Sequence, residues 1–198
     1  SCLRPRKSAA RARNSAQRSL SGARLTGGKF GGSDFSRSNM AQANVANGEF
    51  NGADFTRADL SKAKLGNGAF VNARFGGAVM VAADAAGANL AGADFSNADV
   101  SSATFGQAAL NGARFIATRA QGANFLRAGL RRADFTLAHL SQADFTGADL
   151  AGAKFDRANL SGANFAAARN LNQRQLNSAC GDADTRLPPG FAALTYCQ

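Results

Sequence analysis

Apolar residues recur along this chain at a fixed interval of five positions. From Leu20 to Phe165 every fifth residue is apolar, and these 30 positions hold 14 Phe, 10 Leu, two Val, two Met and two Ala. A second series, also in steps of five, runs from Ala23 to Ala168. Its residues come two positions before those of the first series, as Ala23 does before Leu25, and they are only Ala, Gly, Ser and one Thr. A period of five fits neither a strand nor a helix. The chain is therefore predicted to turn once every five residues, with one large and one small side chain pointing inward each time.

The repeated unit has a recognisable form. It is seen in Ala53–Arg57 (ADFTR), in Ala58–Lys62 (ADLSK) and at the start of the segment that begins with Ala163. This unit resembles the A(D/N)LXX repeat of the pentapeptide repeat family, and the resemblance covers about three quarters of the chain. It implies an all-β solenoid, a right-handed quadrilateral β-helix with four pentapeptides per coil. Thirty units at four per coil would make about 7.5 coils.

The phenylalanines support four sides independently of the resemblance. In steps of 20 from Phe35 the inward residue is always Phe. This predicts one aromatic column made of Phe35, Phe55, Phe75, Phe95, Phe115, Phe135 and Phe155. A three-sided coil would instead stack Phe35 on Phe50 and Leu65.

Charges alternate in the position just before this column. The six residues in steps of 20 are Asp54, Arg74, Asp94, Arg114, Asp134 and Lys154. Because neighbouring strands lie about 4.8 Å apart, this order predicts an exposed ladder of salt bridges along one face. Exposed pairs contribute only about 0–1 kcal/mol each, so the ladder is expected mainly to fix the register of the coils.

The repeat stops at Asn170, and three parts are predicted: a basic N-terminal arm or cap over 1–19, the β-helix over 20–169, and a C-terminal cap over 170–198. The segment Asn172–Gly181 predicts a short helix ending at Gly181. A solenoid needs its ends covered. The apolar residues expected to fold over the last coil are Phe191, Leu194 and Tyr196.

Two cysteines of the predicted cap, Cys180 and Cys197, bracket a short loop. A disulfide between them would stabilise the fold by about 3 kcal/mol and would indicate the periplasm, secretion or an organelle lumen. Two unpaired thiols are the alternative, and the protein would then be cytoplasmic. Cys2 is expected to be an inert thiol, with lipidation or an intermolecular bond as alternatives.

The net charge is +10, and six of these charges belong to the arm. The arm contains no acidic residue; its basic residues are Arg4, Arg6, Lys7, Arg11, Arg13 and Arg18. Three interpretations stay open: a solvated cap, the remnant of a targeting presequence, and an arm that binds nucleic acid, lipid headgroups or an acidic protein. The arm has no aromatic residue, which weakens the case for a single-stranded nucleic-acid site.

Catalytic chemistry finds little support in the sequence. One His and three Cys cannot make a multi-histidine or four-cysteine zinc site. The single histidine, His139, occupies an outward position of the repeat, and neither cap cysteine has a histidine nearby in sequence. We expect no enzymatic activity, no catalytic residue, no bound metal and no cofactor. No apolar run is long enough for a transmembrane helix.

The uninterrupted series favours a non-enzymatic scaffold, a rigid rod that presents flat faces to a protein partner or a multi-subunit assembly. The resemblance implies a second possibility, since some pentapeptide repeat proteins mimic DNA and protect gyrase. Such mimicry needs an acidic surface, and the region 20–169 has 15 basic against 11 acidic residues. A third possibility is binding of nucleic acid or another anionic surface through the arm.

Overall fold

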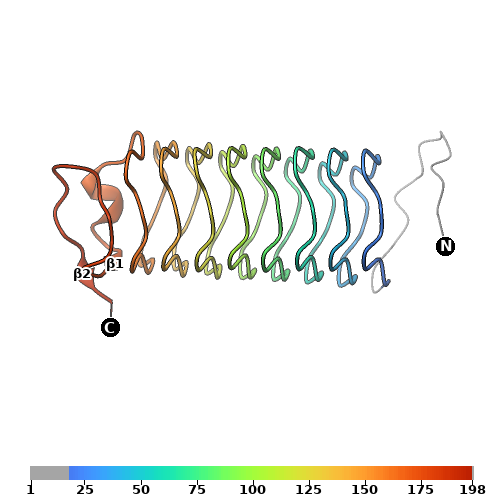
Figure 1. Ribbon diagram of the computed structural model, residues 1–198, viewed down its shortest axis with the longest axis horizontal. Helices are drawn as coiled ribbons and strands as arrows, with labels where there is room; N and C mark the ends of the chain where they lie inside the picture. Colours follow the sequence, from blue (N-terminus) through green and yellow to red (C-terminus); the bar gives the residue numbers. More distant parts are fainter. Residues whose placement is uncertain (1–17, 198) are drawn as a thin grey trace.

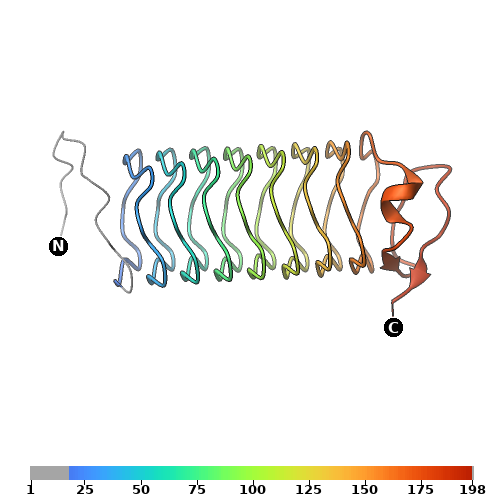
Figure 2. The same ribbon diagram turned by 180° about the vertical axis from the view of Figure 1, so that it is seen from behind.

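A computed structural model of the protein describes residues 18–197. The described chain winds into a long rod of stacked rungs, with a C-terminal cap at one end (Figure 1), and the view from behind shows the same regular stack (Figure 2). The residue just before each inward apolar residue is the middle residue of one straight side of the rod. Parallel bridges join each middle residue to the middle residue four repeats later, from Ser19 with Asn39 to Asp149 with Arg169. A turn occurs every five residues. One rung therefore takes four repeats and four turns, which makes the fold a β-solenoid.

Each turn is closed by a backbone hydrogen bond. The amide of the small residue donates to the carbonyl of the inward apolar residue three positions earlier, as Ala53 does to Phe50 at 3.0 Å. The third residue of every turn has a φ between +52° and +69°, the region that type II turns require. Glycine fills 12 of these 30 positions and Ala, Asn, Gln, Ser, Lys, Arg or Leu the others.

Aspartate and asparagine stabilise these turns from the position before the inward residue. Their Oδ1 accepts the amide hydrogen two residues later in 15 turns; in one of them Thr56 donates to Asp54 over 2.8 Å. This bond satisfies an amide that the rung-to-rung ladder does not use. The D/N of the repeat is thus explained by backbone chemistry.

Two turns that lack such a residue borrow an oxygen from the rung before. Ala69 and Gly129 offer no side-chain acceptor, and the amides of Val71 and Arg131 donate instead to Asn51 at 2.9 Å and Asn111 at 3.1 Å. Both asparagines lie four repeats before the amide that they accept from, so the rung-to-rung register also fixes this contact.

The interior is filled by the inward series. Every inward side chain from Met40 to Phe165 is fully buried. The rings of the column Phe35 to Phe155 stack with centroids 4.7–5.2 Å apart and planes within 9°. In the C-terminal half a second column packs edge-on against it at 79–88°; its members are Phe105, Phe125, Phe145 and Phe165.

The three glycines of the small series have a packing reason. On the side that carries Phe30, Phe50 and Phe70, each ring covers the residue two positions before it. A Cβ at Gly48 would lie 2.4 Å from Cε2 of Phe50, and those at the other two glycines would lie 2.2 and 2.6 Å from their rings. From Leu90 onward the inward residue on this side is Leu and the small residue is Ala. Glycine therefore accompanies Phe on this side, and alanine accompanies Leu.

The cap contains the 3-10 helix η1 (Gln173–Leu176) and the strands β1 (Cys180–Gly181) and β2 (Thr195–Tyr196), which pair in parallel. Leu176 is fully buried, and the residues that pack partly buried against the core are Leu171, Leu187, Phe191 and Leu194. β1 also continues the solenoid, since the amide of Leu160 donates to the carbonyl of Cys180 at 2.8 Å.

Two expectations about the cap are wrong. The helix ends at Leu176 rather than at Gly181, because the chain must extend again to pair with the last rung. Gly181 lies buried in β1, where a Cβ would come within 3.0 Å of Leu194 and within 2.8 Å of Thr185. Tyr196 does not cover the last coil but is 71% exposed.

The fit of glycine and phenylalanine predicts a coupled pair of mutations. Gly48→Ala should destabilise the fold by about 1–3 kcal/mol, because the added methyl group collides with the ring of Phe50. Adding Phe50→Leu creates the Ala–Leu pair that later rungs use. The double variant should therefore lose at least about 1 kcal/mol less than the sum of the single variants. Thermal and denaturant unfolding followed by circular dichroism measures the cycle, and strict additivity would contradict the packing argument.

Candidate functional site: the faces of the solenoid and its capped end

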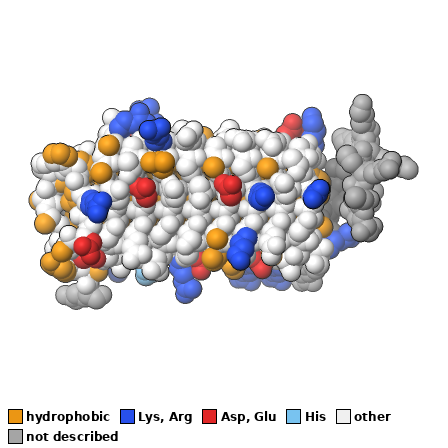
Figure 3. Space-filling model, in the orientation of Figure 1, with side chains coloured by type: hydrophobic (Ala, Val, Ile, Leu, Met, Phe, Trp, Pro, Cys, Tyr) orange, Lys and Arg blue, Asp and Glu red, His pale blue; other side chains and the backbone are white. Residues whose placement is uncertain are grey.

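The middle residues of each side, linked by bridges four repeats apart, define four faces of the rod. We name the "charged face" by its middle residues, which are Asp34, Asp54, Arg74, Asp94, Arg114, Asp134 and Lys154. The other faces are named by their first middle residues as the Ser19 face, the Arg24 face and the Lys29 face. Figure 3 shows one side of the rod, on which charges of both signs are scattered over a flat surface.

Salt bridges on the charged face form as three separate pairs. Arg74 Nη1 lies 3.4 Å from Asp54 Oδ2, Arg114 Nη1 3.5 Å from Asp94 Oδ2, and Lys154 Nζ 4.0 Å from Asp134 Oδ2. In the described residues no salt bridge joins Arg74 to Asp94 or Arg114 to Asp134. The predicted ladder is therefore not continuous, because each cation reaches back to the preceding rung and leaves the following one.

The turns orient these carboxylates. In each of the three aspartates Oδ1 accepts an amide hydrogen of its own turn, from Thr56, Ser96 and Thr136. The other oxygen, Oδ2, faces the cation. The three cations are 55–67% exposed, so each pair adds little to stability and remains open to contact from outside.

The other predicted site residues are distributed as follows. The phenylalanine column lies inside the rod and reaches no face. Of the arm, Arg4, Arg6, Lys7, Arg11 and Arg13 lie outside the described residues. Arg18 is exposed beside the first rung, where its carbonyl accepts the amide of Asn39 at 2.9 Å.

A disulfide joins Cys180 to Cys197. It links β1 to the residue after β2, and the amide of Cys197 donates to the carbonyl of Gly181 at 3.1 Å. Since β1 is also hydrogen-bonded to the last rung, the disulfide holds the tail against the end of the solenoid.

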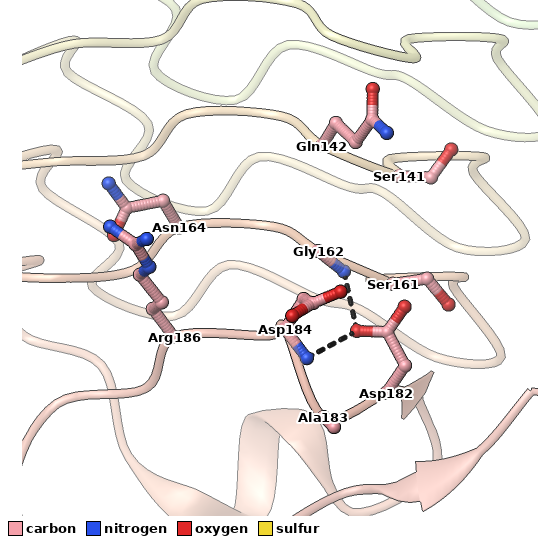
Figure 4. A pocket seen from close by; sticks show the side chains of 9 residues that line it. All are labelled: Ser141, Gln142, Ser161, Gly162, Asn164, Asp182, Ala183, Asp184 and Arg186. Atoms are coloured by element: carbon pink, nitrogen blue, oxygen red, sulfur yellow. Dashed lines mark hydrogen bonds between the residues drawn. The ribbon is translucent and has the colours of Figure 1, made fainter.

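A shallow polar hollow of about 560 Å³ lies between the turn at Ser161 and Gly162 and the loop that follows β1 (Figure 4). Oδ1 of Asp182 accepts the amides of Gly162 at 2.8 Å and Asp184 at 3.0 Å, together with the hydroxyl of Thr185 at 3.1 Å. The bond from Gly162 is the main reason that the pKa of Asp182 lies below its usual range, and those from Thr185 and Asp184 add to it. Asp182 therefore fastens the loop to the last rung, a role that its sequence position alone did not reveal.

The described part of the chain offers little chemistry for catalysis. His139 is exposed on the Ser19 face. Between residues 18 and 197 no group of three His, Cys, Asp or Glu side chains is placed to hold a metal ion. None of the helices described is long and apolar enough to cross a bilayer.

The disulfide predicts a redox-dependent stability. Reduction, or Cys180→Ser with Cys197→Ser, should lower the free energy of unfolding by about 3 kcal/mol, because it frees the loop between the two cysteines. Hydrogen exchange should rise first at the amides of Cys180 and Arg186, which are bonded to Ala158 and Ala163 of the last rung. The double variant should no longer respond to reductant. Equal stability of oxidised and reduced protein would contradict this role.

Asp182 predicts loosening of the cap in acid. Because its pKa is lower in the folded chain, the stability it contributes is complete above the usual range of an aspartate and is lost as the pH falls below that range through the lower pKa of the folded chain. The rate of hydrogen exchange at the amides of Gly162 and Asp184, corrected for the intrinsic rate, should therefore increase as the pH is lowered. Asp182→Asn should remove this pH dependence, and the same dependence in both proteins would assign it to another group.

Comparisons with known proteins agree with this architecture. A profile described as "Pentapeptide repeat region" matches residues 88–165, and one described as "Pentapeptide repeats (8 copies)" matches 19–57 and 38–77. No curated protein matches the sequence.

Several solved structures are similar. QnrB1, a plasmid-mediated fluoroquinolone resistance protein, matches 85% of this chain and 89% of its own at 21% identity, with a TM-score of 0.67. HetL, a pentapeptide repeat protein involved in heterocyst differentiation regulation in the cyanobacterium Nostoc, matches 89% of this chain and 94% of its own at 23% identity, with a TM-score of 0.45. A pentapeptide repeat protein of the Arabidopsis thaliana thylakoid lumen matches 64% of this chain and 70% of its own at 29% identity, with a TM-score of 0.37. The chain has a five-residue repeat, rungs of four repeats and matches to two pentapeptide repeat profiles. It therefore belongs to the pentapeptide repeat family.

Proposed function

We propose that this protein is a non-enzymatic scaffold, a rigid rod that binds a protein partner or a larger assembly through its flat faces. One observation carries the proposal: the rungs run from Ser19 to Arg169 without an inserted loop, and every inward side chain from Met40 to Phe165 is buried. The inward positions serve the rod alone. The outward positions are left to vary, and binding information must lie in them.

The same proposal includes the finer architecture. The rod would be a right-handed, four-sided helix of about 7.5 coils over 20–169, between the arm over 1–19 and the cap over 170–198. The bridges between residues four repeats apart support four sides, and the likeness to QnrB1 supports the overall fold.

Mimicry of DNA is the weaker alternative. A DNA mimic needs a continuous negative surface, because proteins that bind DNA respond to the closely spaced charge of its phosphates. On the charged face, Arg74, Arg114 and Lys154 alternate with the aspartates. The likeness to QnrB1, at 21% identity, supports a shared fold and does not carry a shared target.

Binding through the N-terminal arm is a third candidate, favoured by its six basic residues. The disulfide supports a periplasmic, secreted or lumenal location, since such bonds persist in oxidising compartments.

Capture of partners tests the scaffold. The immobilised full-length protein is compared with a variant whose six basic arm residues are replaced by Gln, and with an unrelated protein of similar net charge. Proteins captured from native extract at about 0.15 M salt, where the Debye length is about 8 Å, are identified by mass spectrometry.

The scaffold predicts at least one protein that both versions capture and that then binds the purified rod at a defined stoichiometry. Capture by the intact arm alone would favour the third candidate, and inhibition of gyrase supercoiling would favour mimicry. Capture of nothing beyond what the charge control retains would contradict the scaffold.

A further inference from the structure

Six of the seven middle residues of the charged face, all except Asp34, follow a self-complementary order of charges. From Asp54 to Lys154 the six middle residues read acid, base, acid, base, acid, base. Because the number is even and the alternation strict, the same row read backwards places a base at every acid. A second copy of this chain, turned end for end, carries the matching row at the same spacing.

We propose that the charged face is an interface for a second copy of the chain, with the two rods antiparallel. The twofold axis would run along the rungs, between the rungs of Asp94 and Arg114. It sets Asp94 against the second copy's Arg114, Arg74 against its Asp134, and Asp54 against its Lys154. Symmetry repeats each contact, so six opposite pairs form.

The salt bridges within one copy fit this register. They join Asp54 to Arg74, Asp94 to Arg114 and Asp134 to Lys154. The pair Asp54–Arg74 lies opposite the second copy's pair Asp134–Lys154. The central pair Asp94–Arg114 lies opposite the same pair of the second copy, in reversed order. Each internal pair therefore keeps its partner while each charge gains another, and Oδ1 of every aspartate is already held by its turn.

The corner beside this face fits the same register. An axis along the rungs sets each corner against the same corner of the other copy. Leu137, which is 40% exposed, would then meet the rung of Gly76 and Gly77, which has no side chains at its turn. By the same operation Arg57 meets a turn of the second copy that carries an acid and a base, Asp156 and Arg157. An exposed Leu opposite a turn made only of glycines thus follows from the register that the middle row alone selects.

Other arrangements are disfavoured by the same row. A twofold axis along the rod makes the copies parallel and sets every charge against itself. Sliding the antiparallel copies by one rung, about 4.8 Å, sets like charges opposite along the row. Sliding by two rungs keeps opposite signs but loses a third of the pairs. The row thus selects one register by repulsion as well as by attraction.

The size of the face implies a weak dimer. Six rungs cover about 24–29 Å of the rod, and a side with its corners is about 15 Å wide, which gives about 400 Å² per copy and about 800 Å² in total. Stable complexes bury about 1,200–2,000 Å². We therefore expect concentration-dependent association with a dissociation constant between about 10 µM and 1 mM.

This inference deepens the proposed function and rests on its premise that the faces bind proteins. The two are tested separately. Self-association is measured on purified protein alone, whereas the scaffold is tested by capture from extract, so either test can fail without the other.

Sedimentation equilibrium on the purified full-length protein tests the dimer, from about 10 µM to about 1 mM in 0.15 M salt. At this ionic strength the Debye length is about 8 Å, which screens the net charge of +10 more than charges in contact. We expect the weight-average mass to rise from 20.3 kDa toward twice that value. A mass that stays at 20.3 kDa over the whole range would overturn the proposal.

Charge exchange tests the register. Asp94→Arg sets like charges opposite and should weaken association at least about tenfold. Asp94→Arg combined with Arg114→Asp reverses the central pair in both copies and should restore association to within about threefold. The matched control is Asp84→Arg on the Arg24 face, which loses the same kind of turn bond, from Ala86 at 3.0 Å, and should change nothing.

Circular dichroism first establishes that each variant is folded. Among folded variants, three outcomes reject this register: Asp94→Arg without effect, a control as damaging as Asp94→Arg, or an exchange that does not restore association.

Discussion

Backbone pairing between successive rungs, four repeats apart in sequence, is the constraint on which the rest of the structure depends. Each middle residue from Asn39 to Arg169 makes two backbone bonds to the preceding rung: the amide of Asp54 donates to the carbonyl of Ser33 at 2.9 Å, and the carbonyl of Asp54 accepts the amide of Phe35 at 2.7 Å. Keeping this register on a four-sided path forces a turn every five residues and a small residue inside each corner. It also stacks residues that lie 20 positions apart in sequence, so one inward Phe column and one outward charge row arise from the same spacing.

Much of this could be predicted from the sequence, because the two inward series carry the period directly. The predicted pairing of Cys180 with Cys197 was also found, since both lie in the short segment that must close the last rung. What the sequence could not show depends on side-chain direction. The gaps in the salt-bridge ladder arise because Arg74 leans toward Asp54 and away from Asp94, and the need for Gly48 arises from the orientation of the Phe50 ring. The length of η1 was missed because pairing of β1 with the last rung overrides the local helical preference.

The separation of inner and outer positions connects this fold to the proposed function. Inward residues are fixed by packing and turn residues by backbone geometry, so the outward middle residues are the freest to carry binding information. They form straight rows at a constant rung spacing, and a matching partner must present its groups at that same spacing. A second copy of the rod does so by construction, which is why a solenoid with an alternating row is prone to recognise itself.

Cross-linking of engineered cysteines on the Arg24 face tests the four-repeat register most directly, in a chain that keeps its native disulfide and carries Cys2→Ser. Thr104→Cys with Asn124→Cys places thiols on bridged residues of adjacent rungs, where neighbouring strands lie about 4.8 Å apart, within the Cα separation that a disulfide spans. Thr104→Cys with Arg119→Cys, three repeats apart, is the matched pair for a three-sided coil. The account predicts rapid oxidation of the first pair and none of the second, and the reverse result would contradict it.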